Sequence, residues 1–267
     1  MARQLRDWSP SFLLCTRHAT RLGPERLDRA LAGIDNALWY FDAPHRPEVL
    51  DLARRVRRTY VTWSSTGDWL RENGVTDVRF LPQAADLDFD APAGEVAESF
   101  QCDLSFIGSG QYRDRWPLLQ RLARECTMQI RGPGWREAPA DLPVAGGEIR
   151  GHAFAQAVTG AAVSLGANAL ASLHADPASA SNRMWKVLGC GGAYLGQWMP
   201  GIEGLAEDGV HCRWFHDADQ ASAILAELLT DPESRRAMAA RGREYVLAHH
   251  TYDVRLSLIL ANGHFKS

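Results

Sequence analysis

The chain has 267 residues, of which 46% are hydrophobic and 23% charged, and its formal net charge is −3. These proportions are typical of a globular protein and exclude a disordered, coiled-coil or collagen-like chain. Because the chain has no basic excess, no nucleic-acid partner is expected.

Targeting and redox signals both favour a cytoplasmic protein. No apolar run approaches the roughly 18–20 residues that span a bilayer, so no membrane span is expected. The first residues lack the apolar core of a secretory signal. The five cysteines are scattered and form no CxxC pair. This usage indicates reduced thiols, without a disulfide framework or a zinc site.

Short apolar runs alternate with helical periodicity through the first part of the chain. Strands are predicted at 11–15, 37–41, 60–63 and 78–81, and helices at 26–32, 47–57 and 65–73. The repeated order of strand, helix and strand indicates a parallel sheet wound by helices. This unit is small for a complete wound domain, so either the N-terminal domain is abbreviated or upstream sequence has been lost.

A stretch with little periodicity follows the fourth strand. Residues 82–99 read PQAADLDFDAPAGEVAES, with two prolines and several acidic side chains. Such a composition is typical of a linker between domains, and we place the boundary near Glu98.

The alternation of strands and helices then restarts. Strands are predicted at 102–107, 128–131, 162–165 and 193–196, and helices at 115–126, 149–158, 181–188, 220–229, 232–249 and 254–261. The sequence therefore predicts an α/β fold of two wound units with parallel sheets. In such folds the ligand lies at the carboxyl ends of the strands, here in the cleft between the units.

Glycine turns in the second unit are candidate phosphate sites. Gly108-Ser109-Gly110 follows a strand and precedes a helix, with Arg113 and Arg115 close by. Glycines let the backbone approach an anion, and arginine can hold phosphate oxygens in a bidentate way. The alternative is an ordinary tight turn between strand and helix.

The start of the helix predicted at 181–188 is a second candidate. Ser181 or Asn182 suits the N-cap, and Asn182 and Arg183 either bind a ligand or serve only the fold. Lys186 lies one turn after Asn182 on the same face, where it reaches a diphosphate or is simply solvated.

A third candidate is the loop Pro200-Gly201-Ile202-Glu203, which follows the strand at 193–196. Its amides suit sugar hydroxyls or a phosphate, and Glu203 suits hydroxyls as an acceptor. The alternative is an ordinary loop in which Glu203 favours the helix dipole.

Several catalytic motifs are absent from the sequence. The histidines form no HExxH set, and there is no Walker A or GxSxG sequence. Kinase, nucleophilic hydrolase and zinc chemistry are therefore not expected, and no metal site is predicted.

Long segments of the chain resemble the CgeB-like branch of the group 1 glycosyltransferases. They read DLSFIGSGQYRDRWPLLQRLA (103–123), IRGPGW (130–135), SNRMWKVLGCGGAYLGQWMPGIEGLAEDGVHCRWFHD (181–217) and DPESRRAMAARGREYVLAHHTYDVRLSLIL (231–260). WYFDAP (39–44) and VTWSSTGDWLRENGVTDVRFLPQAAD (61–86) resemble the second half of that family's N-terminal domain. The resemblance covers nearly the whole chain.

The resemblance implies a GT-B fold and a glycosyltransferase that uses a nucleotide-diphosphate sugar as donor substrate. It also implies that transfer is retaining and needs no metal or other cofactor. Residues 1–98 would be a partial acceptor-side domain with linker, 99–250 the donor-binding domain, and 251–267 a helix returning to the first domain. The acceptor is an unknown glycan, protein or small molecule.

Site residues carry over from the family by position. Gly108, Ser109, Gly110 and Arg113 or Arg115 would approach the diphosphate, and Gly134 and Trp135 the base. Asn182 and Arg183 would face the donor phosphates, and the loop from Pro200 to Glu203 the sugar. His18 and Asp42, which follow two strands of the first unit, are candidates for positioning the acceptor; the alternative for Asp42 is an Asx turn.

Two positions depart from the family pattern and leave alternatives open. Ala178 and Lys186 replace glutamates of the wider group, the second of which binds ribose hydroxyls there. Lys186 either grips the diphosphate instead or donor binding is impaired. The alternative to a transferase is thus a GT-B-like binding or scaffold protein without turnover. A nucleotide-sugar epimerase is a third hypothesis, but the sequence shows no clear pair of acid and base carboxylates.

Overall fold

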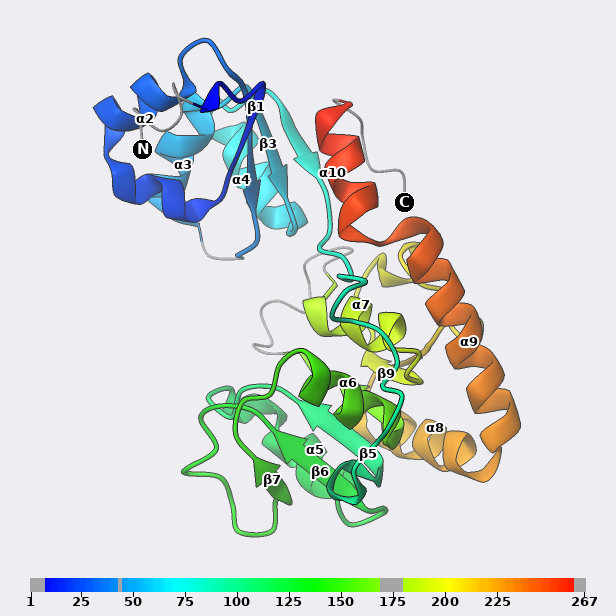
Figure 1. The fold of residues 1–267 in the computed structure, drawn as a ribbon. Helices are drawn as coiled ribbons and strands as arrows, with labels where there is room; N and C mark the ends of the chain where they lie inside the picture. Colours follow the sequence, from blue (N-terminus) through cyan, green and yellow to red (C-terminus); the bar gives the residue numbers. More distant parts are fainter. Residues whose placement is uncertain (1–7, 43–44, 169–179, 262–267) are drawn as a thin grey trace. The chain divides into compact units, whose positions relative to one another are not determined.

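The structure is a computed structural model that describes residues 8–42, 45–168 and 180–261. It divides into two compact units (Figure 1). Unit 1 comprises Met1–Gln83 with Arg255–Ser267, and unit 2 comprises Ala84–Val254. No helix within the described ranges is long and apolar enough to cross a membrane.

Unit 1 is built on a parallel sheet with the strand order β1-β2-β3-β4. Its strands are β1 (Phe12–Cys15), β2 (Asp35–Tyr40), β3 (Arg58–Val61) and β4 (Val78–Phe80). The connecting helices are η1 (Arg17–Leu22), α2 (Pro24–Leu31), α3 (Pro47–Arg55) and α4 (Ser64–Glu72). The apolar faces of these helices pack on strands β2 and β3, which are buried along nearly their whole length. This agrees with the wound sheet that the sequence predicts.

The last helix, α10 (Tyr252–Leu260), contributes its residues from Arg255 onward to unit 1. Arg255 on this helix is fully buried, and its Nε donates to the carbonyl oxygen of Pro82 at 2.9 Å. A buried guanidinium needs such an acceptor, so this bond fixes the end of the chain to the residues that follow β4.

Unit 2 is built on a parallel sheet with the strand order β10-β9-β8-β5-β6-β7. Its strands are β5 (Cys102–Ile107), β6 (Met128–Arg131), β7 (Val144–Gly146), β8 (Ala161–Gly166), β9 (Tyr194–Gln197) and β10 (Arg213–Phe215). Its helices are η2 (Glu98–Phe100), η3 (Arg113–Arg115), α5 (Trp116–Leu122), α6 (His152–Thr159), α7 (Asn182–Gly189), η5 (Ile202–Gly204), α8 (Ala218–Thr230) and α9 (Pro232–His249). β7 and β10 are not among the strands predicted from the sequence.

The order of these strands places a switch point between β5 and β8. The chain winds outward from β5 through β6 to β7 and then returns to β8 on the opposite side of β5. At such a point the loops that follow the two strands diverge, which leaves a crevice at their carboxyl ends. In unit 2 the switch point lies between the residues that follow Ile107 and those that follow Gly166.

Residues 84–98, which we call the strap, pack on unit 2 instead of forming a free linker. Ala85 pairs with Thr251 in a parallel bridge. Farther along, the amides of Ala93 and Ala97 donate to Thr159 Oγ1 and Gln156 Oε1 of α6, each at 3.0 Å. The division between units therefore falls at Gln83–Ala84, whereas the composition of the sequence suggests a boundary near residue 98.

Candidate functional site

Two arginines meet at the switch point of unit 2. Arg183 lies in the first turn of α7, where its amide donates to the N-cap oxygen, Ser181 Oγ. Its Nε donates to the carbonyl oxygen of Ile107 at 2.5 Å, and its Nη1 to that of Ala167 at 3.4 Å. Arg115 Nη1 also donates to the Ala167 carbonyl, at 3.2 Å. The two side chains therefore share one acceptor between the ends of β5 and β8.

The ring of Phe106 supports both guanidinium groups. It is fully buried, and its centroid lies 4.7 Å from Arg183 Cζ and 5.0 Å from Arg115 Cζ. A cation over an aromatic ring is stabilised by the ring quadrupole. Gly108 leaves space for Arg183, since a Cβ there would lie 2.6 Å from Nη2. The pair is thus held by carbonyls and an aromatic ring.

The charges of this pair are not neutralised within the described part of the chain. Neither guanidinium forms an ion pair with a described carboxylate, and Arg115 Nε has no hydrogen-bond partner among the described residues. Burial lowers the pKa of Arg115 to about 10, and the charge of Arg183 contributes to the same shift. Burial also lowers the pKa of Arg183. Two adjacent, desolvated cations of this kind favour an anion with several oxygens, such as a diphosphate.

The turn Gly108-Ser109-Gly110 contributes less than the sequence suggests. The amides of Gly108 and Gly110 donate to the carbonyls of Arg131 and Pro133 at 2.9 and 2.8 Å. A Cβ at Gly110 would lie 2.6 Å from the carbonyl oxygen of Gly134. These glycines therefore allow two loops to pack closely, and an anion here would be held mainly by arginine side chains.

The other residues predicted to lie near the donor have different surroundings. Trp135, expected near a base, is buried in the core, and its Nε1 donates to the carbonyl oxygen of Gly108 at 2.9 Å. Arg113 forms an ion pair with Glu137 and lies over the ring of Trp116. Asn182 is exposed at the start of α7. Of the two alternatives for the diphosphate, the geometry favours Arg115 over Arg113.

Lys186 forms an ion pair with a residue of the strap. Its Nζ lies 2.9 Å from Oδ1 of Asp90 in the strap and 4.8 Å from the ring centroid of Phe154. Asp90 is only 2% exposed, so the ammonium group neutralises a buried carboxylate. The structure thus gives Lys186 a partner that neither sequence-based alternative includes, and a contact between Lys186 and a diphosphate stays a prediction. Ala178, the other departure from the family pattern, lies outside the described residues.

Changing Lys186 to glutamate tests this assignment. We expect Lys186→Glu to lower the free energy of unfolding by about 3–5 kcal/mol, because it leaves the buried Asp90 carboxylate facing a second negative charge. Thermal unfolding measures the loss. Adding Asp90→Asn to the same variant removes the repulsion and should recover most of it. An unchanged Tm in Lys186→Glu would contradict the ion pair.

The loop after β9 remains a candidate for sugar contacts. Gly201 has φ of 77°, which a glycine adopts readily, and η5 follows it. Ile202 is buried in the core, so its side chain is not free for a ligand, whereas Glu203 is exposed. The amide of Asn168 donates to Gln197 Oε1 at 3.2 Å and joins the ends of β8 and β9. The loop thus follows the strand next to the arginine pair.

His18 and Asp42 lie in unit 1, after the adjacent strands β1 and β2. His18 is exposed, and the Asp42 carboxylate accepts from Arg17 Nη1 at 2.6 Å. They therefore lie at the same edge of the parallel sheet, and their part in positioning an acceptor stays a prediction.

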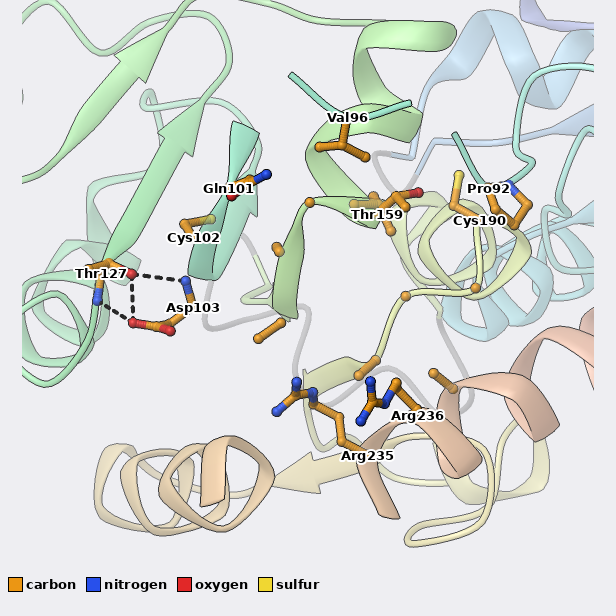
Figure 2. A pocket seen from close by; sticks show the side chains of 18 residues that line it. Pro92, Val96, Gln101, Cys102, Asp103, Thr127, Thr159, Cys190, Arg235 and Arg236 are labelled. Atoms are coloured by element: carbon orange, nitrogen blue, oxygen red, sulfur yellow. Dashed lines mark hydrogen bonds between the residues drawn. The ribbon is translucent and has the colours of Figure 1, made fainter. Parts of the chain in front are cut away.

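A pocket of about 740 Å³ lies at the opposite edge of the unit 2 sheet (Figure 2). Cys102 and Ala161, which begin β5 and β8, line it, and Arg235 and Arg236 extend into it from α9. Burial raises the pKa of Cys102 to about 11, so its thiol is protonated at neutral pH. No sequence motif marks this pocket, because its lining comes from many separate elements.

The sequence does not identify three partners of the predicted site residues, namely Phe106, Asp90 and the Ala167 carbonyl. Phe106 lies two residues before Gly108, on the strand predicted at 102–107, but an apolar residue in a buried strand gives no signal of its own. Asp90 lies in the strap, far from Lys186 in the sequence.

The chain matches one protein-family model, and its fold is similar to those of several solved structures. Residues 113–261 match a family model described as glycosyl transferase-like. Sucrose-phosphate synthase from Thermosynechococcus elongatus has a similar structure (TM-score 0.68, 13% identity, 97% of this chain and 75% of that chain). HepE from Anabaena, solved in complex with UDP and glucose, is similar too (TM-score 0.70, 11% identity, 98% of this chain and 81% of that chain). A glycosyltransferase from Rickettsia africae also has a similar structure (TM-score 0.67, 7% identity, 98% of this chain and 78% of that chain).

No curated protein matches the chain. At these identities the structural likeness concerns the fold alone. It confirms the predicted fold class, in which two α/β units with parallel sheets correspond to the GT-B architecture.

Proposed function

This chain belongs to the glycosyl transferase-like family, and we propose that it transfers a sugar from a nucleotide-diphosphate sugar to an acceptor hydroxyl. The observation that carries the proposal is the Arg115–Arg183 pair, two cations without a described carboxylate partner at the switch point of unit 2. The complex of HepE with UDP and glucose supports a donor of this class. The CgeB-like branch and retention of configuration are part of the proposal.

In the proposed reaction, the bond between the anomeric carbon and the diphosphate oxygen breaks, and the nucleoside diphosphate leaves with the electron pair. The acceptor oxygen forms the new bond to the anomeric carbon, and its proton passes to a base. Negative charge therefore develops on the diphosphate as the bond breaks. Arg115 and Arg183 are held in place before the reaction and would stabilise that charge. Their two positive charges make a catalytic metal unnecessary in this proposal.

The proposal is tested by release of nucleoside diphosphate from UDP-, GDP-, TDP- and CDP-glucose. The full chain is incubated with each donor and a panel of acceptors, with EDTA or with magnesium. We expect release from one donor class, at the same rate in EDTA. Binding of a nucleotide without release would favour the alternative of a binding protein, and neither binding nor release would contradict the proposal.

A further inference from the structure

A second, smaller basic pocket lies wholly within unit 1. It has a volume of about 160 Å³, and its lining includes Arg17, His18, Arg21, Arg46 and Glu48. Arg17, His18 and Arg21 belong to η1, which follows β1, and Arg46 is the N-cap residue of α3. The pocket therefore opens at the carboxyl edge of the parallel sheet, the edge at which wound sheets bind ligands.

Positive charge exceeds negative charge in this pocket. Arg17 is paired with Asp42 at 2.6 Å, and Arg46 Nη1 lies 3.9 Å from Glu48 Oε1, too far for a strong hydrogen bond. Arg21 forms no ion pair with any carboxylate that the structure describes. Three guanidinium groups thus face two carboxylates.

The size of the pocket limits what can enter it. A volume of about 160 Å³ accommodates a compact group such as a phosphoryl group. Guanidinium groups that approach from two elements match the several oxygens of a phosphoryl group better than they match a neutral hydroxyl.

We propose that this pocket binds the phosphoryl group of a phosphorylated acceptor. That the phosphoryl group belongs to a sugar acceptor rests on the proposed function, whereas the binding of a phosphoryl group at Arg21 and Arg46 does not. His18 and Asp42 lie beside the bound group in this arrangement, so an acceptor held here by its phosphate would have its remaining atoms close to both candidates for positioning it.

Inorganic phosphate is the first probe. The amides of the full chain are followed by NMR during a phosphate titration at constant ionic strength, with UDP present in excess to occupy the Arg115–Arg183 pair. We expect saturable shifts at Val49 and other residues around the pocket, and an apparent Kd about tenfold weaker in Arg21→Gln. Arg26→Gln removes the same charge from an exposed position on α2 and should leave the Kd unchanged.

The proposal would be overturned if phosphate caused no shifts around the pocket. It would also be overturned if Arg21→Gln and Arg26→Gln weakened the apparent Kd equally. A phosphate response that depends on Arg21, in a chain that does not bind UDP, would support this pocket while contradicting the proposed donor site.

A second arm distinguishes an acceptor phosphate from free phosphate. With an active donor, kcat/KM for a hexose 6-phosphate should exceed that for the free hexose at least tenfold, and Arg21→Gln should reduce this ratio. Equal values for the two sugars would show that the pocket binds free phosphate only and would overturn the acceptor assignment.

Discussion

Arg183→Gln is expected to raise the Kd for UDP about 30-fold. The change removes one of the two guanidinium groups that meet between the ends of β5 and β8, and charge-assisted hydrogen bonds to phosphate contribute about 1.5–3 kcal/mol. Isothermal titration calorimetry measures the Kd. Arg113→Gln is the matched control, because Arg113 is exposed and paired with Glu137. We expect its Kd to stay within about twofold of the unchanged chain.

A structural role alone would give a different pattern. Arg183→Gln loses bonds to two carbonyls but also relieves repulsion from Arg115, so its Tm should change little. Arg183→Lys keeps the charge but not the bidentate geometry, and we expect an intermediate Kd. If UDP affinity fell only in proportion to a loss of stability, Arg183 would belong to the fold and not to the site.

Gly132→Ala is expected to reduce the free energy of unfolding by about 3–5 kcal/mol. Gly132 has φ of 143°, and a Cβ there would overlap the backbone carbonyl group of Gly108. Backbone atoms cannot turn aside as a side chain does, so the cost combines overpacking with conformational strain. Urea unfolding of the full chain measures the loss.

Gly209→Ala separates the two components of this cost. Gly209 also has a positive φ, 72°, but nothing lies within 4 Å of a Cβ at this position. We expect it to cost about 1–2 kcal/mol, the strain alone. Equal losses in the two variants would contradict the close packing of the Gly108 and Gly132 loops.

The alternation of strands and helices could be predicted because most strands are buried and apolar. β5 and β8 follow this rule, and their positions in the structure agree closely with those expected. β7 and β10 could not be predicted, because each has three residues at an edge of the sheet and no apolar run marks it. Short edge strands depend on pairing with a neighbour more than on their own sequence.

The position of the strap could not be predicted from the sequence, for a different reason. Its proline and acidic residues are those of a linker, but Asp90 is buried against Lys186. The contact joins residues far apart in the chain, and no periodicity signals it. For the same reason the sequence predicts Lys186 at a diphosphate or in solvent, although an ion pair determines its position.

The candidate site could be predicted in part. Arg115 and Arg183 can be identified from the sequence because arginines near the start of a helix that follows a strand are a signal for phosphate. Their convergence on the Ala167 carbonyl and the Phe106 ring depends on the order of β5 and β8 in the sheet, which the sequence does not reveal. The ligand contacts assigned to Trp135 and Glu203 stay predictions.

Binding of a diphosphate by the Arg115–Arg183 pair is tested most directly by a calorimetric titration with uridine, UMP and UDP. Each added phosphate meets a guanidinium group, so the affinity should rise in steps, with UDP binding at least about 100-fold more tightly than uridine. Arg183→Gln should remove most of this rise. The same titration is repeated with the guanosine, thymidine and cytidine series. If the nucleoside and its diphosphate bound with equal affinity in every series, a diphosphate site at this pair would be contradicted.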